Sequence, residues 1–418
     1  MPKLLETYSR ATGLQISHNQ FLLEKFYPLP TSKKYITIHA SSGMPGKNYA
    51  YWNEVLDLIF PLLHNNNIDI IQIGGKEDPP LKHCAHLQGL TDLHQTNYIL
   101  ARSILHLCND TFSAHRAGAL GIPLVELFGP TEVENHAPLI FNKKSAFLKS
   151  HRFGKKASFA AQENPATINL IKPETVVTSI LEIFGVNQGI INRESLLFGQ
   201  GYQNPIVEFV PNMNVDPNAF KNVMFVLRLD YLPSLEGQVE EYIKNILSNK
   251  SCIIVLNKVI NPDFLKAFAR NIQTINYEIS EKDDINYIKF LSRLGIKVRF
   301  FTKETDAEKL SKLREKFFDV IWIEKFSEKT KQNFLEESEK YINSKLDKDL
   351  IFSDTSSLWF RSNKFILSEG KIFLSKAHLD ANLPTNSFEN NIMNIIDNDM
   401  FWKEMDHYYI FKQKINKN

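Results

Sequence analysis

The chain has 418 residues, of which 43% are hydrophobic and 23% charged, a composition typical of a globular protein with about two domains. Its formal net charge of +2 gives no strong positive field, which argues against a nucleic-acid-binding protein. No apolar run approaches the length of a membrane span and no signal-peptide pattern is visible. We therefore expect a cytoplasmic protein, with peripheral membrane contact left open. The three cysteines show neither a CxxC pattern nor metal-ligand spacing, which predicts free thiols.

In the first half of the chain, apolar runs alternate with segments of helical periodicity after a helical lead-in over residues 1–30. The predicted strands are Tyr35–His39, Asp69–Ile73, Ile104–Cys108 and Leu124–Phe128. The predicted helices are Tyr51–His64, Leu93–Ala101, Phe112–Leu120 and Glu174–Phe184. This alternation predicts an α/β domain over residues 31–185, with a Rossmann-like, doubly wound parallel sheet.

Residues 186–220 are rich in Gly, Asn and Pro and predict a linker. A second alternation predicts another Rossmann-like α/β domain over residues 221–346, and residues 347–418 predict a small C-terminal β-rich appendage. The predicted strands of this second domain are Val223–Leu229, Ser251–Leu256, Ile296–Phe301 and Val320–Ile323. Its predicted helices are Glu236–Leu247, Asp283–Leu294, Ala307–Phe317 and Asn333–Leu346.

Polar loops follow the first two predicted strands, where a doubly wound sheet binds its ligands. The first loop contains Ser41, Ser42 and Lys47 among glycines, which let a backbone approach a phosphate while the lysine supplies charge. The second loop, Gly74 to Asp78, offers carboxylates that can accept hydrogen bonds from a ribose. An ordinary surface loop and a glycine turn with solvated charges are the alternatives.

The third predicted strand is followed by Asp110, Thr111 and Phe112 at the start of a helix. The free backbone amides of such a first turn form a site for a diphosphate, although capping alone would also explain the sequence. The fourth strand runs into a tight turn, Gly129 to Thr131, at the same edge of the sheet.

The order of these motifs resembles the donor-binding half of glycosyltransferase family 9, the heptosyltransferase family of GT-B type. That family has a strand ending in His-Ala/Pro-Ser/Thr, a Gly-Gly-x-x-Glu/Asp turn and an Asp-Thr-Gly/Ser-x-x-His motif. It ends this half with Ala-Leu-Gly-x-Pro-x-Val-x-Leu-Phe-Gly-Pro-Thr, which stands here as Ala119 to Thr131. The resemblance covers residues 31–185.

The resemblance implies that Ser41 and Ser42 contact the phosphates of a nucleotide-diphosphate sugar and that Lys47 neutralises the diphosphate. It also implies that backbone amides at the start of the third-strand helix hold phosphate. Phe112 stands where the family usually has a small residue, and Tyr49-Ala50 replaces Trp-Pro. These departures leave the nucleotide and the sugar open and would also suit a degenerate, non-catalytic site.

By the same resemblance, Glu77 or Asp78 would hold the ribose and Asp110 would bind sugar hydroxyls. His115 is either a supporting hydrogen-bonding group or a packed core histidine. The candidate donor-binding residues are Ser41, Ser42, Lys47, Glu77, Asp78, Asp110, Thr111, Phe112, His115, Gly129 and Thr131.

Members of this family normally carry their acceptor domain before the donor domain, whereas here only residues 1–30 precede it. One hypothesis is a reversed order of halves, in which Asp230 or Glu236 of the second domain is the general base that an inverting transfer needs. The alternative is that Asp230 only ends a strand.

The resemblance implies a glycosyltransferase that moves a sugar, with heptose among the candidates, from a nucleotide-diphosphate donor to a glycan or lipid-linked acceptor, as in lipopolysaccharide biosynthesis. No metal or other cofactor is expected, since no Asp-x-Asp motif stands at a strand end. The alternatives are a non-catalytic nucleotide-sugar-binding module and a GT-B-like nucleotide-sugar epimerase. No nucleic-acid partner is expected, and the oligomeric state stays open.

Overall fold

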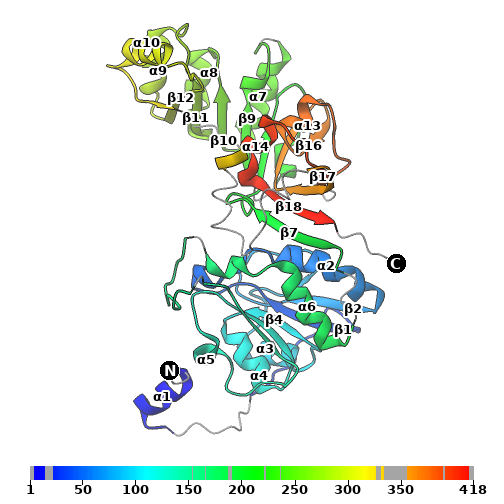
Figure 1. The fold of residues 1–418 in the computed structure, drawn as a ribbon. Coiled ribbons are helices and arrows are strands. Elements are labelled where there is room, and N and C mark those ends of the chain that lie inside the picture. Colours follow the sequence, from blue (N-terminus) through cyan, green and yellow to red (C-terminus); the bar gives the residue numbers. More distant parts are fainter. Residues whose placement is uncertain are drawn as a thin grey trace. The chain divides into compact units, whose positions relative to one another are not determined.

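The computed structural model describes most of the chain as two compact units (Figure 1). One unit contains Met1–Ser195 and the other consists mainly of Leu196–Ser338 and Leu346–Phe411. No helix in the described part is long and apolar enough to cross a membrane. The described residues are 4–14, 22–152, 154–164, 166–186, 191–220, 223–235, 237–325, 331–333, 355–388 and 391–413.

The first unit is built on a six-stranded sheet of order β3-β2-β1-β4-β5-β6, in which all neighbouring strands are parallel. This is the strand order of dinucleotide-binding folds, in which the order reverses between β1 and β4. Loops at the carboxyl ends of these strands therefore surround the switch point. The strands are β1 (Lys34–His39), β2 (Ile68–Gln72), β3 (Ala85–His86), β4 (His106–Asn109), β5 (Leu124–Phe128) and β6 (Ala146–Lys149).

Helices cover both faces of this sheet, with α2 and α6 on one face and α3 and α4 on the other (Figure 1). Asp92 and Gln95 form a capping box that starts α3, and Gly185 ends α6 in the left-handed conformation. The helices are α1 (Leu4–Thr12), α2 (Trp52–Asn65), α3 (Leu93–Ala101), α4 (Phe112–Ala119), α5 (Val133–His136) and α6 (Pro173–Phe184), with short 3₁₀ turns η1 (Pro45–Lys47) and η2 (Thr167–Leu170).

The core of the first sheet is apolar except for a few buried polar side chains. Strands that are covered on both faces read as nearly continuous apolar runs, as β5 does in Leu124, Val125, Leu127 and Phe128. Glu126 interrupts this run and is completely buried. A buried polar side chain needs a partner or a special role, so such residues mark the places to examine.

The second unit is built on an eight-stranded sheet of order β13-β12-β11-β10-β9-β8-β15-β16. All neighbouring strands are parallel except the pair β15 and β16. The strands are β8 (Ile206–Phe209), β9 (Met224–Arg228), β10 (Cys252–Leu256), β11 (Ile272–Glu278), β12 (Lys297–Thr302), β13 (Ile323–Lys325), β15 (Lys364–Ser368) and β16 (Lys371–Phe373). The crossover helices are α7 (Gln238–Asn249), α8 (Pro262–Ala267), α9 (Ile285–Ser292) and α10 (Ala307–Phe317).

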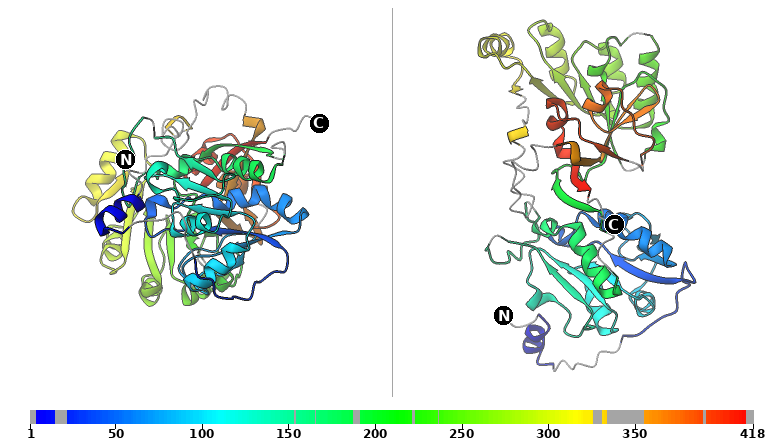
Figure 2. Two further views of the ribbon diagram at one scale, coloured as in Figure 1. Left: turned by 90° about the horizontal axis from the view of Figure 1, so that it is seen from below. Right: turned by 45° about the vertical axis from the view of Figure 1, so that its right-hand side comes forward.

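A smaller sheet has the order β17-β14-β18-β7. In Figures 1 and 2 its red strand β18 lies beside the green strand β7, and orange elements lie beside the green strands of the second unit. Its strands are β7 (Arg193–Phe198), β14 (Leu358–Ser362), β17 (Ile392–Asn394) and β18 (Tyr408–Gln413), accompanied by α13 (Lys376–Asp380) and α14 (Asp399–Lys403).

The mixed α/β class with parallel sheets is confirmed in both units, but two predictions about segments are wrong. The expected linker over residues 186–220 contains β7 and β8, because its short apolar runs are buried in the two sheets. Residues 347–418 do not form an appendage of their own, since β15 and β16 extend the eight-stranded sheet. The pattern also missed β3, α5 and β6 in the first unit and α8 and β11 in the second. Most of the expected helix Asn333–Leu346 lies outside the described residues.

Candidate functional site

Three loops at the carboxyl edge of the first sheet meet at the side chain of Asp110. Lys47 Nζ lies 2.7 Å from Asp110 Oδ2, and the hydroxyl of Thr131 donates a hydrogen bond of 2.6 Å to the same oxygen. The three residues are only 9%, 5% and 2% exposed. The structure therefore brings together three of the residues that the sequence predicted separately, and we call this group the Lys47 cluster.

The position of Lys47 is fixed by the turn η1 and its neighbours. The amide of Gly46 donates a 2.8 Å hydrogen bond to the carbonyl of Ala161, and a Cβ at this glycine would lie 3.2 Å from that oxygen. The side chain of Asn48 accepts from the amide of Ser42 at 2.6 Å and donates to its carbonyl at 3.2 Å. The first loop is thus held by a close backbone contact and an amide clamp, which present Lys47 to Asp110.

Of the two acids in the second loop, only Asp78 is turned toward the site. Its Oδ2 accepts a 2.8 Å hydrogen bond from the amide of Gly75 and lies 3.7 Å from His39 Nε2. Burial acts to raise the pKa of Asp78, but hydrogen bonds from His39, Gly75 and Ser41 outweigh it and lower the pKa. Asp78 is therefore a carboxylate, whereas Glu77 is exposed.

Only glycine fits at position 74, where the backbone φ is +146° and a Cβ would lie 2.1 Å from Asp78 Oδ2. The Gly-Gly pair after β2 therefore forms the turn and also leaves room for the Asp78 carboxylate.

A chain of buried polar side chains connects β1, β4 and α4, and the sequence did not identify it as part of the site. Ser113 Oγ lies 3.0 Å from His39 Nδ1 and 2.9 Å from His106 Nε2, and His106 Nδ1 lies 2.9 Å from Thr37 Oγ1. Burial and the nearby His39 lower the pKa of His106 to about 3, so its ring is neutral. The sequence signal for this series of hydrogen bonds was the presence of polar residues inside apolar strands.

The first turn of α4 is not capped by the side chain that precedes it. Thr111 is the N-cap residue, but its hydroxyl lies 3.2 Å from His39 Nδ1 and 2.9 Å from Ser113 Oγ and makes no capping hydrogen bond. Phe112 is 44% exposed and packs edge-on against His39, with 5.2 Å between the ring centroids. The large side chain therefore points away from the interior and leaves the amides of this turn available to an anion.

His115, one turn further along α4, is partly buried. Burial is the main cause that lowers its pKa, with Asp110 acting in the opposite direction. A neutral imidazole packed near Asp110 fits the supporting role better than a charged contact to a ligand.

The fourth loop is fixed by the segment that follows β6. A Cβ at Gly129 would lie 2.7 Å from Ile168 Cβ, and Arg152 donates a 2.8 Å hydrogen bond to the Gly129 carbonyl. Arg152 also pairs with Glu163 at 2.8 Å. Burial acts to raise the pKa of Glu163, but its hydrogen bonds, first among them that from Arg152, lower it to about 2. The ion pair that holds the turn carrying Thr131 is therefore present at neutral pH.

Asp230, a candidate base, lies in the short turn η5 (Leu229–Tyr231) of the second unit and is held by an ion pair. Arg228 Nε donates to Asp230 Oδ1 at 2.8 Å and Nη2 donates to Oδ2 at 2.7 Å, so both carboxylate oxygens face one guanidinium. The side chain of Asp230 is 6% exposed. This arrangement favours a structural role over that of a base, while Glu236, the other candidate, lies outside the described residues.

Arg228 belongs to a larger buried ionic network, which we call the Arg228 cluster. Arg228 Nη1 donates to Glu208 at 2.6 Å, and Lys364 bridges Glu208 and Glu404 at 3.0 and 2.6 Å. Tyr408 completes the network through a 2.7 Å hydrogen bond to Glu404. The cluster consists of Glu208, Arg228, Asp230, Lys364 and Glu404, with Tyr408 at its edge.

The second unit has a cavity of about 520 Å³ beyond the carboxyl ends of β9 and β10. Apolar side chains such as Leu235 and Phe264 line it together with Lys258 and Asn261. Gly237, which also lines it, precedes the first residue of α7. The cavity lies where open α/β sheets bind ligands.

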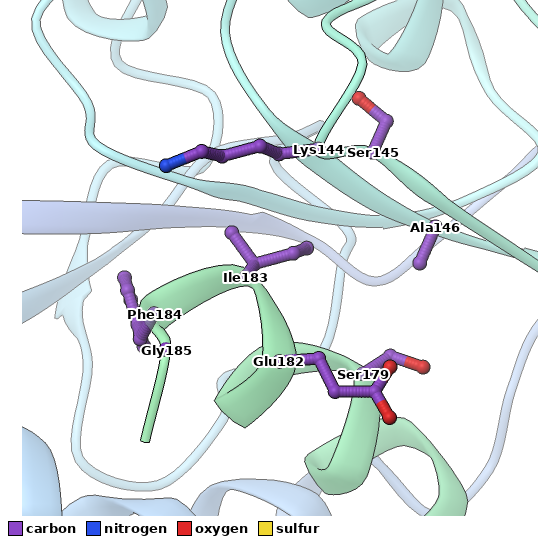
Figure 3. A pocket seen from close by; sticks show the side chains of 8 residues that line it. All are labelled: Lys144, Ser145, Ala146, Ser179, Glu182, Ile183, Phe184 and Gly185. Atoms are coloured by element: carbon purple, nitrogen blue, oxygen red, sulfur yellow. The ribbon is translucent and has the colours of Figure 1, made fainter.

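The first unit has a smaller cavity of about 340 Å³ at the opposite edge of its sheet (Figure 3). It is lined by Lys144, Ser145 and Ala146 at the start of β6 and by Glu182 and Gly185 at the end of α6. The candidate site at the carboxyl edge is therefore separate from this cavity. Among the described residues, no three His, Cys, Asp or Glu side chains are grouped so that they could hold a metal ion.

The fold defines the first unit as a Rossmann-like α/β domain, and its polar loops form a candidate ligand site at the switch point. Residues 6–165 match the model of a known family, described as glycosyltransferase family 9 (heptosyltransferase). The resemblance identified from the motifs is thereby confirmed for this segment of the chain. No curated protein sequence matches the chain.

Three solved structures give the scale of the structural similarity. The chain is 18% identical to the ADP-heptose lps heptosyltransferase II of E. coli, with a TM-score of 0.30, over 44% of this chain and 53% of that one. It is 16% identical to a family 9 glycosyl transferase from Veillonella parvula, with a TM-score of 0.29, over 43% and 50%. It is 15% identical to E. coli heptosyltransferase WaaC with ADP, with a TM-score of 0.30, over 43% and 54%. The chain thus spans about half the length of these structures.

Proposed function

We propose that the protein is a glycosyltransferase whose first unit binds a nucleotide-diphosphate sugar and whose second unit binds the acceptor. The observation that carries this proposal is the Lys47 cluster, which lies at the switch point of the first sheet beside the uncapped first turn of α4. It lies within the segment that matches the family 9 model. We further propose that the transferred sugar is a heptose and that the acceptor is a glycan or a lipid-linked molecule.

The diphosphate is held in this proposal by one cation and by backbone amides. Lys47 shifts from Asp110 toward a phosphate oxygen, and the amides of Phe112 and Ser113 donate to the same group at the positive end of α4. Ser41 and the backbone of Ser42 border the same loop. Lysine and the helix dipole together stabilise the negative charge that develops on the leaving diphosphate, so we propose a reaction without a metal ion.

The two aspartates of the site have different proposed roles. Asp78 is a carboxylate at the end of β2, the position at which dinucleotide folds hold a ribose. Asp110 is nearest to the cation and to Thr131, and it is proposed to bind sugar hydroxyls. Buried polar groups that match a hydroxyl pattern reject analogues that lack it, which makes Asp110 the main determinant of sugar choice.

For the general base we propose Glu236 in preference to Asp230. Asp230 is bound through both oxygens to Arg228, and removing a proton from an acceptor would compete with that pair. The chain neighbours of Glu236, Leu235 and Gly237, both line the 520 Å³ cavity at the carboxyl edge of the second sheet. An acceptor hydroxyl bound in this cavity would thus lie beside Leu235 and Gly237.

Calorimetric titration of the full chain with ADP, UDP, GDP and CDP tests the donor site. We expect one nucleoside diphosphate to bind, and Lys47→Met to weaken that binding by about tenfold to a hundredfold, the range for a charge-assisted hydrogen bond. Lys144→Met, at the opposite edge of the sheet, is the matched control and should bind as the unmodified chain does. Failure of all four nucleotides to bind would contradict the proposal.

A nucleotide-sugar-binding module without transfer is the second candidate, and the saturated pairing of Asp230 favours it. Release of nucleoside diphosphate from a sugar donor separates the two functions. Slow hydrolysis that is abolished by Glu236→Gln supports the transferase, whereas tight donor binding without any release supports the module. An epimerase ranks last because it would need further acid and base groups at the donor site.

A further inference from the structure

Glu126 is a buried carboxyl group that has no role in the donor site proposed above. It lies in the middle of β5, where its backbone is paired between Cys108 of β4 and Phe147 of β6, and its side chain has no exposed surface. Neither Oε1 nor Oε2 has a hydrogen-bond partner among the residues that the structure describes. Leaving a charged carboxylate in such a place would be very costly, so the group must be neutral or be served by a nearby charge.

The residue after Glu126 contacts the Lys47 cluster, because the amide of Asp110 donates a 3.1 Å hydrogen bond to the carbonyl of Leu127. Burial is the main cause that raises the pKa of Glu126 well above its usual value, the charge of Asp110 raises it further, and Lys47 lowers it. Lys47 thus acts on two carboxyl groups, of which only Asp110 is in direct contact with it, at 2.7 Å.

The other titratable groups that face this cluster come from the neighbouring elements. Cys108 of β4 is a buried thiol whose pKa is raised, first by burial and then by Glu126. His115 of α4 has its pKa lowered, mainly by burial, and it interacts with His136 of α5 as well as with Asp110 and Lys47. Lys47 is therefore the cation that acts on both carboxyl groups in this set.

We propose that Glu126 is a positioning residue for Lys47: as a neutral acid it leaves Lys47 available to the diphosphate of the donor, and its ionisation holds Lys47 in the protein and weakens donor binding. The inference rests on the proposed donor site. It concerns a residue that the motif does not specify, since the family pattern leaves this strand position open.

The physical basis is competition for one cation. With Glu126 neutral, the Lys47 cluster contains one lysine and one carboxylate, and an arriving diphosphate can share the lysine with Asp110. With Glu126 ionised, two buried carboxylates attract the same lysine and repel the ligand. By linkage, a ligand that prefers the protonated protein also raises the affinity of Glu126 for its proton, and binding takes up protons wherever Glu126 is partly ionised.

The test is the pH dependence of ADP and UDP binding to the full chain between about pH 5.5 and 8.5, a window around neutrality. Affinity of the unmodified chain is expected to fall by about tenfold relative to Glu126→Gln as the pH rises, since one unit of pKa shift corresponds to tenfold in affinity. Titration of the nucleotide phosphate itself is common to both proteins and cancels in this comparison.

Proton uptake measured by calorimetry in two buffers of different ionisation enthalpy is the second readout. The unmodified chain should take up more protons on binding than Glu126→Gln, and Glu126→Leu should behave as the glutamine variant does. Glu182→Gln, at the opposite sheet edge, is the matched control and should keep the pH profile of the unmodified chain.

Two failures are distinguishable. If neither nucleotide binds at any pH, the donor site itself is refuted and the role of Glu126 with it. If a nucleotide binds and the pH profile of Glu126→Gln equals that of the unmodified chain, the role of Glu126 is refuted while the donor site stands.

Discussion

The two units each bury an ionic cluster at strand ends, and the clusters differ in whether every carboxyl group has an ionic or hydrogen-bonding partner. The Arg228 cluster has a guanidinium that binds Asp230 through two hydrogen bonds and Glu208 through a third. The Lys47 cluster has one lysine on one carboxylate, with a further buried carboxyl, Glu126, that has no hydrogen-bond partner. A lysine is a compact charge that can change partners, whereas the planar fork of arginine fixes its partners in place.

A carboxylate at a strand end therefore indicates a ligand site only when the partners of its cation are also known. A saturated cluster stabilises the fold, and an unsaturated cluster keeps binding capacity for a ligand at the expense of stability.

Arg228→Ala should produce the largest loss of stability. It would leave Asp230 as a buried charge without its cation and Glu208 with Lys364 as its remaining cation, and breaking such a buried pair typically lowers the free energy of unfolding by about 3–5 kcal/mol. Urea denaturation of the full chain measures the loss, and nucleotide binding per folded molecule should be unchanged. A variant of normal stability that had lost binding or transfer would show instead that the Arg228 cluster is a ligand site.

Asp110→Asn and Asp230→Asn should affect different properties. Asp110→Asn removes the charge that holds Lys47 and is expected to change donor binding by about 1–3 kcal/mol, the range for hydrogen bonds to charged groups. Asp230→Asn should lower stability by a similar amount and leave the rate of transfer per folded molecule intact. Loss of transfer at unchanged stability in Asp230→Asn would restore Asp230 as the base.

The two units should also respond to acid in different pH windows. The pKa of His106 falls from 6.5 to about 3 on folding, so stability that is present above pH 6.5 is lost as the pH falls from 6.5 toward 3. Glu404 has a pKa below 4.5, because its attraction to Lys364 and its hydrogen bonds outweigh burial, so its contribution is lost only below pH 4.5.

Denaturation of the unmodified chain and of His106→Gln between pH 7 and 4.5 measures the first of these effects. The expected size is a few kcal/mol at most, from about 1.4 kcal/mol for each pKa unit. Equal slopes for the two proteins in this window would contradict the assignment of a neutral buried His106.

The smallest effects are expected from single hydroxyl groups. Thr131→Val and Tyr408→Phe each remove one hydrogen bond to a buried carboxylate, at 2.6 and 2.7 Å, and should each lower stability by about 1–3 kcal/mol. Only Thr131→Val should also change nucleotide affinity, which calorimetric titration measures. A change of affinity in Tyr408→Phe as well would remove the distinction between the clusters.

Part of the candidate site was predictable because its signals are local. The loops after β1, β2, β4 and β5 were identified from glycines and polar residues that follow apolar runs. Even the pair of Arg228 and Asp230 had a local signal, since residues two apart near a strand end lie on the same side. The sequence analysis considered Asp230 as a base because a carboxylate at a strand end looks the same whether it serves catalysis or an ion pair.

The contacts that define the site could not be predicted, because they join segments that are distant in the chain. Nothing in the sequence near Glu126 shows that its oxygens lack partners, since that depends on what α4 and its neighbours place against β5. The same holds for the chain from Thr37 through His106 and Ser113 to His39, in which each hydrogen bond except that between His106 and Ser113 joins distant parts of the sequence.

The sequence by itself predicted most helices and strands of the first unit in their order, with β3, α5 and β6 missed, because periodicity, capping residues and glycine stops act over a few residues. Leu93–Ala101 and Leu124–Phe128 have the predicted bounds in the structure. Only the tertiary structure decided which strands are neighbours, such as β15 beside β8, and which cation pairs with each carboxylate. Those choices depend on burial and charge summed over the whole fold, and no local pattern contains that sum.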